Sequence, residues 1–104
     1  MTKVKIQAGP CGFVTYATAE LTDDDKVKVT VDSPCVSVSK LAMKLDEALD
    51  PYSVCFHKPG MDPIHAAARG CYTAHAGCPV IIGIVRAVEA EAGLCLKKPM
   101  HVTF

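Results

Sequence analysis

The sequence contains no tryptophan, few other aromatic residues and no excess of charge of either sign. Lys and Arg together number 11, Asp and Glu also number 11, and the formal net charge is therefore zero. A neutral chain lacks the positive surface that draws nucleic acid or an anionic membrane to a protein. We therefore expect neither nucleic acid nor a membrane as a partner.

The sequence also lacks a long apolar run. The longest one, residues 78–85, is much shorter than the roughly 20 residues that cross a bilayer as a helix. The first six residues alternate between polar and apolar, which is unlike a signal peptide, so we expect a cytoplasmic protein. The 104 residues, half of them hydrophobic, suit a single domain over residues 1–104 that buries its own core.

Alternation of apolar and polar residues predicts four strands, over residues 2–7, 13–21, 26–32 and 98–104. Short turns separate the first three, which should therefore pair antiparallel. Strands that precede a run of helices are typical of the α+β class. The sequence predicts an antiparallel sheet of three to four strands, in the order β-β-β-α-α-α-β, with the helices on one face.

Three helices are predicted from a capping residue followed by proline, at Ser33-Pro34, Asp62-Pro63 and Cys78-Pro79. The first helix should run to Asp50-Pro51, the second to Gly70, and the third to about residue 92, with residues 52–61 irregular. Glycine within the third helix, at position 83, lowers its helix propensity and would permit the close approach of another backbone.

Six cysteines are the unusual feature of the composition. Four of them lie where a strand or helix is expected to begin or end, so that their side chains are available to a site: Cys11, Cys35, Cys71 and Cys78. The other two, Cys55 and Cys95, lie between apolar neighbours, and we expect them to pack as small core residues.

The partial positive charge at a helix N-terminus favours the thiolate form of cysteine, which is both the nucleophile and the metal ligand. Cys35 and Cys78 have this placement. If Cys11 and Cys71 join them, four thiolates would suit a zinc ion or an iron–sulfur cluster. His75, within a C-x3-H-x2-C segment, could replace one thiolate. The chain has no paired C-x2-C motif, however, and buried, reduced thiols explain the same residues.

Other candidate residues carry less information. His57 and His101 are expected at the surface or in a strand, and His65 on the surface of a helix or as a hydrogen-bonded core residue. The chain has no phosphate-binding loop, no dinucleotide fingerprint and no nucleophile–base pair at a recognisable spacing. An ordinary metabolic enzyme is therefore the least supported function.

Nearly the whole chain resembles a small uncharacterised four-cysteine family of anaerobic bacteria and archaea. The matching features are these: Cys11-Gly12-Phe13, Cys35, Cys71, His75, Cys78-Pro79-Val80 and a helix that ends in Glu-x-x-x-Gly-Leu. The pattern more loosely resembles TSCPD-type domains, named for a Thr-Ser-Cys-Pro-Asp segment, of which residues 76–80 retain Cys-Pro. The resemblance implies that the four cysteines at element ends belong to one set.

Two functions follow from these observations, with a third reading beside them. The first is a module that binds a metal ion or an iron–sulfur cluster through the four cysteines. The second is a thiol–disulfide redox protein in which Cys78 or Cys35 pairs with Cys71 or Cys11. In the third, the chain is a small interaction module whose thiols only pack. Sheet edges could support a homodimer, and the sequence identifies no protein partner.

Overall fold

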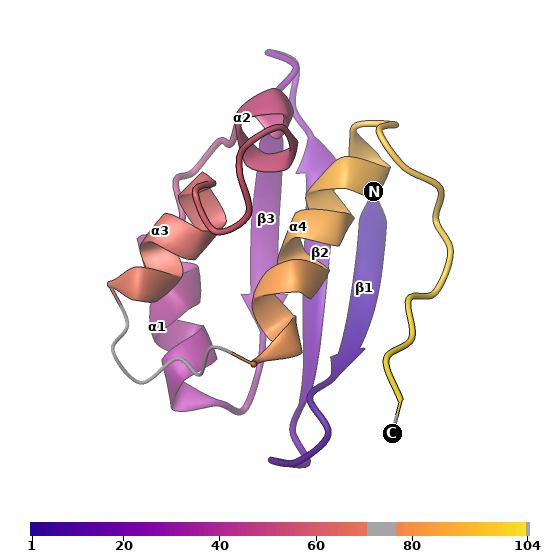
Figure 1. Cartoon of the computed structure of the whole chain (residues 1–104). Helices are drawn as coiled ribbons and strands as arrows, with labels where there is room; N and C mark the ends of the chain where they lie inside the picture. Colours follow the sequence, from indigo (N-terminus) through magenta and orange to yellow (C-terminus); the bar gives the residue numbers. More distant parts are fainter. Residues whose placement is uncertain (71–76, 104) are drawn as a thin grey trace.

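The computed structural model describes residues 1–70 and 77–103. In this part of the chain, three strands form one antiparallel sheet in the order β1-β2-β3: β1 (Thr2–Gln7), β2 (Val14–Leu21) and β3 (Val27–Asp32). Four helices follow along the chain: α1 (Val36–Lys44), α2 (Pro51–Cys55), α3 (Pro63–Arg69) and α4 (Pro79–Glu91). Figure 1 shows the helices gathered on one face of the sheet. The predicted α+β class and antiparallel sheet are confirmed.

The two faces of the sheet differ as the alternation of the sequence predicts. Ala17 and Ala19 of β2 are fully buried on the face that packs against α4. On the other face, the ammonium group of Lys3 lies 4.8 Å from the centre of the Tyr16 ring, which is a cation–π contact across two strands. One face of the sheet therefore packs against the helices, and the other carries polar side chains.

Gly83 brings α4 close to the sheet. A Cβ atom at this position would lie only 2.4 Å from Cδ1 of Ile6 and 2.5 Å from its Cγ1. Such separations are far below the optimum of about 3.5–4.0 Å between carbon atoms. A close approach is therefore present at this glycine, but its partner is the side chain of Ile6 in β1 rather than another backbone. The contact joins the first half of α4 to the end of β1.

Glu91 holds the C-terminal end of α4 against the sheet. The Thr2 hydroxyl donates to its Oε1 at 2.8 Å, and the Leu21 backbone N–H donates to its Oε2 at 3.0 Å. The Met1 ammonium group lies 3.2 Å from Oε1. The hydrogen bond from Leu21 and the one from Thr2 hold the pKa of this carboxyl below its ordinary value. Glu91 therefore joins the last turn of α4 to the beginning of β1 and the end of β2.

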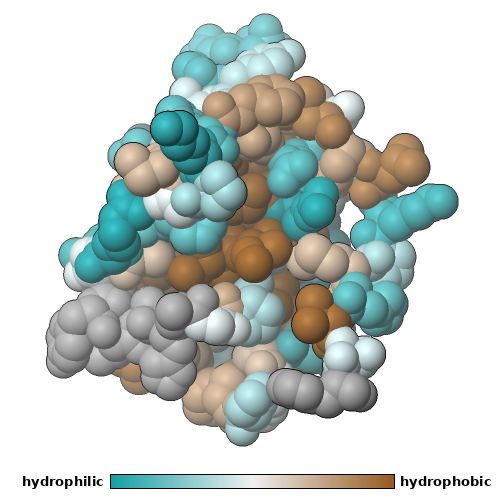
Figure 2. Space-filling view, viewed as in Figure 1, coloured by the Kyte–Doolittle hydropathy of each residue, from teal (hydrophilic) through white to brown (hydrophobic). Residues whose placement is uncertain are grey.

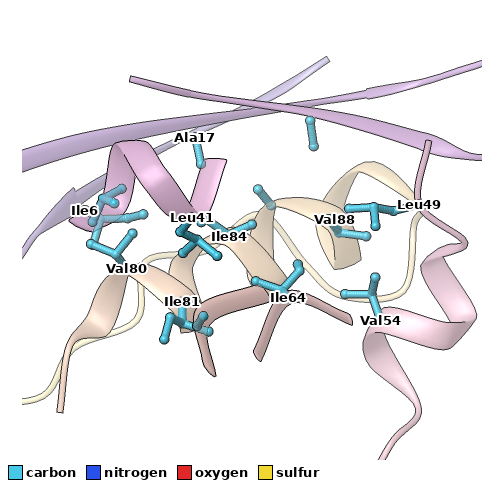
Figure 3. Packing of buried hydrophobic residues seen from close by; sticks show 14 of the residues in the cluster. Ile6, Ala17, Leu41, Leu49, Val54, Ile64, Val80, Ile81, Ile84 and Val88 are labelled. Carbon is cyan, nitrogen blue, oxygen red and sulfur yellow. The ribbon is translucent and has the colours of Figure 1, made fainter. Parts of the chain in front are cut away.

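The hydrophobic core lies between the sheet and the helices (Figure 3). Its largest fully buried side chains come from strands and helices alike: Val27, Ile64, Val80, Ile84 and Val88. Ile6 and Val80 lie toward one end of the core, whereas Leu49 and Val54 lie toward the other, near Val88. A single core thus extends along the length of α4.

The segment after α1 differs from the expectation. The helix ends at Lys44 rather than at residue 50, because Leu49 pairs with Val27: each backbone N–H donates to the other's carbonyl at 2.8 Å. The short helix α2 then forms in a region expected to be irregular. Asp50 caps it by accepting from the Tyr52 N–H at 3.1 Å, and Pro51 takes the first helical position.

The last predicted strand is the other difference. Residues 98–103 form no strand in the structure as described, and Figure 1 shows them as an irregular segment outside the sheet. Met100 is 51% exposed and Val102 is 95% exposed. Pro99 has no backbone N–H to give to a neighbouring strand. Alternation alone therefore did not suffice to form a strand here.

Within residues 1–70 and 77–103, no helix is both long enough and apolar enough to cross a membrane. The longest helix, α4, has 13 residues, against the roughly 20 that a span requires.

Candidate functional site

Two of the predicted site residues lie at the same end of the sheet because the strands are antiparallel. The end of β1, the beginning of β2 and the end of β3 all lie at the same end of the sheet. Cys11 lies in the loop between β1 and β2, and Cys35 follows β3. The loop is a tight turn in which the Gly12 N–H donates to the Gly9 carbonyl at 2.9 Å, and both glycines have positive φ angles of +72° and +79°. This turn leaves Cys11 exposed.

Cys35 is held at the start of α1 by a hydrogen-bonded serine. Its backbone N–H donates to the Ser33 Oγ at 3.1 Å, and the Thr15 hydroxyl donates to the same oxygen at 2.8 Å. Ser33 therefore connects the beginning of β2 to the beginning of α1. The Cys35 side chain is half-buried, and among the described residues it makes no capping hydrogen bond. Its thiol is thus positioned at the helix N-terminus without serving as a cap.

Cys78 occupies the equivalent position at the start of α4. It is the N-cap residue, its backbone is extended with φ −69° and ψ 121°, and Pro79 follows as the first helical residue. It is half-buried, and its thiol makes no capping hydrogen bond within the part of the chain that is described. Glu91 fixes the far end of α4 beside Thr2, so Cys78 lies at the end of the sheet where β1 terminates.

Cys11, Cys35 and Cys78 therefore share one end of the molecule, although they are distant in sequence (Figure 1). We call this the hairpin end, formed by residues 8–13, 33–35 and 77–79. Cys71 and His75 lie outside the described residues. Across residues 1–70 and 77–103, no three His, Cys, Asp or Glu side chains are grouped closely enough to hold a metal ion.

The two remaining cysteines lie at the other end of the molecule. We call this the opposite end, formed by residues 22–26, α2 and residues 92–96. Cys55 is the last residue of α2, and Cys95 follows α4. Burial, with smaller contributions from the negative charges of Glu89 and Cys95, raises the pKa of the Cys55 thiol to about 12. Both side chains are half-buried.

The sequence predicted that these two cysteines pack against apolar residues, and Cys55 does pack against the core. The sequence did not indicate that Cys95 lies close enough to Cys55 for its charge to raise the pKa of the Cys55 thiol. This proximity could not be predicted, because residues 52–61 were expected to be irregular. Only the helix α2 and its packing against α4 bring the two positions together.

His65 is a hydrogen-bonded helix residue rather than an open ligand. Its Nδ1 lies 2.5 Å from Oδ1 of Asp62, which is buried and caps α3. The Asp62 Oδ2 accepts from the backbone N–H groups of Ile64 and His65, each at 3.1 Å. This arrangement confirms the expectation of a satisfied histidine.

A shallow cavity of about 400 Å³ lies between the end of α1 and α3. Apolar side chains, including Leu49 and Ala67, contribute to its lining. Lys44 lies at its rim and donates from Nζ to the Gly70 carbonyl at 3.0 Å. No cysteine is among the described residues that line this cavity.

The helical face also carries exposed apolar side chains. Figure 2 shows hydrophobic surface interrupted by hydrophilic residues on the face viewed in Figure 1. Phe56, Met61 and Leu96 are each more than half exposed, and Phe56 stacks on Tyr52 with ring centres 5.8 Å apart. The homodimer expected as a possibility from the sequence stays a prediction.

The fold and its thiols define a class: a small α+β protein with cysteines at the ends of its strands and helices. The chain belongs to the DUF6951 family, a family of unknown function whose sequence profile matches residues 2–104. No curated protein and no solved structure matches the chain.

Proposed function

We propose that this protein binds a metal ion or an iron–sulfur cluster through Cys11, Cys35, Cys71 and Cys78, with His75 as a replacement or neighbouring ligand. One observation carries the proposal: three distant segments of the chain each bring a cysteine to the hairpin end. A ligand shared by several cysteines requires donors from separate segments to come to one end of the molecule in this way.

The chemistry of the donors fits a soft metal centre. Thiolates are the usual ligands of structural zinc and of iron–sulfur clusters, both of which accept four of them. Cys35 and Cys78 each begin a helix of at least nine residues, where the partial positive charge stabilises a thiolate. Cys11, in an exposed turn, would be the ligand most accessible to solvent. The bound group would tie the hairpin loop to two helices.

The fourth ligand is supported by its tether to Cys78. Only six residues separate Cys71 from Cys78 in the sequence, so one short segment carries both cysteines. His75 lies between them. The described residues alone do not complete a metal site, and the proposal therefore requires Cys71 or His75 to take part. The resemblance to four-cysteine families, including the TSCPD-type domains, supports the same ligand set.

The proposal also includes a reducing compartment, the cytoplasm, where thiols stay available to a metal. The cysteines in the described residues are all free thiols: Cys11, Cys35, Cys55, Cys78 and Cys95. A binding module of this kind needs no substrate pocket of its own, so we propose an accessory or sensing role rather than an enzyme.

The test compares single variants at the two ends of the molecule. The protein would be purified without oxygen, and its iron, zinc and sulfide content and its absorption spectrum would be measured. We expect Cys11→Ser to lose most of the bound metal. This residue is exposed, so its replacement should leave the fold intact, as circular dichroism would verify. Cys95→Ser, at the opposite end, is the matched control and should keep its metal.

The outcomes separate the candidate functions. Iron with sulfide and a visible absorption band indicates a cluster, whereas one equivalent of zinc in a colourless protein indicates a zinc site. Equal metal content in Cys11→Ser and Cys95→Ser would refute the ligand set. Metal-free wild-type protein whose thiols react at the same rate with and without a chelator would favour thiol redox chemistry instead.

A further inference from the structure

At the opposite end of the molecule, α2 packs against α4. We call this interface, around Val54 and Val88, the seam. Val54 of α2 and Val88 of α4 are buried there, and Figure 3 shows Val54 on the side of the core where Val88 lies. Cys55 follows Val54, and Glu89 follows Val88, so both lie along the same seam. The electrostatic effect of Glu89 on the Cys55 thiol agrees with this placement.

The chain after α4 folds back over the last turn of that helix. Gly93 has a φ angle of +76°, its N–H donates to the Ala90 carbonyl at 3.2 Å, and the Leu94 N–H donates to the Glu89 carbonyl at 2.8 Å. These two hydrogen bonds form a Schellman motif, which folds the chain over the last turn of a helix. Residue 94 is thereby held against residue 89, and Cys95 comes next.

We propose that Cys55 and Cys95 form a reversible disulfide that fastens α2 to the end of α4. Both are free thiols and both are half-buried; Cys55 ends α2, which packs against α4, and Cys95 directly follows the Schellman motif at the end of α4. The pair is independent of the proposed metal ligands, because neither cysteine belongs to that set. The oxidant would be a low-molecular-weight disulfide such as oxidised glutathione.

The reaction proceeds in two exchange steps. In the first, the Cys95 thiolate attacks one sulfur of glutathione disulfide; a mixed disulfide forms, and one glutathione thiolate leaves. In the second, the Cys55 thiol gives its proton to solvent and attacks the Cys95 sulfur, which releases the second glutathione thiolate. The two protein thiols thus lose two electrons and two protons, and glutathione disulfide is reduced to two glutathione molecules.

The surroundings of the two thiols explain this order. Burial, together with the charges of Glu89, Cys95 and Asp62, raises the pKa of Cys55 to about 12, while Arg86 opposes the shift. Cys55 is therefore a poor attacking group but can resolve a mixed disulfide that is already formed beside it. The second step should accelerate about tenfold per pH unit below that pKa, because the thiolate is the reacting species.

The test begins with the unmodified protein. It would be incubated anaerobically at increasing ratios of oxidised to reduced glutathione, quenched with acid, alkylated and digested. Mass spectrometry should find the peptides of Cys55 and Cys95 joined by a disulfide, with loss of both alkylation products and their return on reduction. Because the protein is native, this measurement does not depend on the folding of any variant.

Single replacements then separate the two roles. Cys55→Ala should accumulate a glutathione adduct on Cys95, since the resolving thiol is missing. Cys95→Ala should leave Cys55 largely unmodified. In samples first stripped of metal with a chelator, Cys11 provides an internal reference, because its exposed thiol should form an adduct in all three proteins.

Three results would overturn the proposal: no linked peptide at any glutathione ratio that modifies Cys11, equal adduct levels on the remaining thiol of the two variants, or a link of either thiol to a hairpin-end cysteine instead. Metal analysis of the same samples keeps the two proposals separate. The disulfide should form at the opposite end whether or not the hairpin end binds metal.

Discussion

The hairpin end and the opposite end use the same residue type in contrasting ways. At the hairpin end, Cys11 lies in an exposed turn, and Cys35 and Cys78 begin helices. At the opposite end, Cys55 and Cys95 are flanked by apolar residues, and burial raises the pKa of Cys55. A cysteine's environment, rather than its presence, therefore determines which chemistry it can support.

The largest expected difference between the ends is in thiol reactivity. A thiol whose pKa is about 12 is ionised to only about one part in ten thousand at pH 8. Iodoacetamide should therefore modify exposed Cys11 at least about a hundredfold faster than Cys55 in metal-free protein. Peptide mapping at timed intervals would measure both rates in one sample. Comparable rates would remove the distinction between the two ends.

A smaller effect is expected at Glu91, which anchors α4 at the opposite end. Glu91→Gln replaces charge-assisted hydrogen bonds with neutral ones and should lower the free energy of unfolding by about 1–2 kcal/mol at pH 7. The pKa of Glu91 is lowered in the folded state, so its stabilisation is present above the ordinary pKa and disappears as the pH falls through the folded-state value.

The pH dependence supplies a sharper form of this test. Urea denaturation of wild-type protein and Glu91→Gln should show a difference in stability that is constant near neutral pH and shrinks below about pH 4.5. A difference that stayed the same down to about pH 3 would assign the loss to packing rather than to the carboxylate.

The smallest effect is expected nearer the hairpin end, at Gly83. Gly83→Ala would place a methyl group against Ile6, which must shift its side chain, at a cost of about 1–3 kcal/mol. The higher helix propensity of alanine offsets about 1 kcal/mol of that cost. We expect a net loss of about 1 kcal/mol in thermal or urea unfolding. Ile6→Val in the same background should recover part of the loss by making room for the new methyl group.

Much of the fold could be predicted from local signals, and its deviations have non-local causes. Residues 2–7 form a strand with the predicted bounds, and Asp62-Pro63 begins α3 as expected. The early end of α1 depends on the pairing of Leu49 with Val27, which are 22 positions apart. No periodicity within either segment reports such a contact.

The candidate sites likewise divide into those that local sequence signals predict and those that depend on tertiary contacts. Placement of Cys35 and Cys78 at helix beginnings was readable from the proline that lies beside each of them. The proximity of Cys55 to Cys95 was not, since it requires α2 to form and to pack against α4. The cysteines at the beginnings of helices could therefore be predicted from the sequence, whereas the pair that tertiary packing brings together could not.

The length of α4 has a consequence for thiol exchange. The helix begins immediately after Cys78 and ends four residues before Cys95, and its 13 residues span about 20 Å. A rigid spacer of that length prevents the sulfur atoms of its two flanking cysteines from meeting, since a disulfide requires Cα atoms within about 7 Å. The helix therefore keeps Cys78 and Cys95 from forming an intramolecular disulfide with each other.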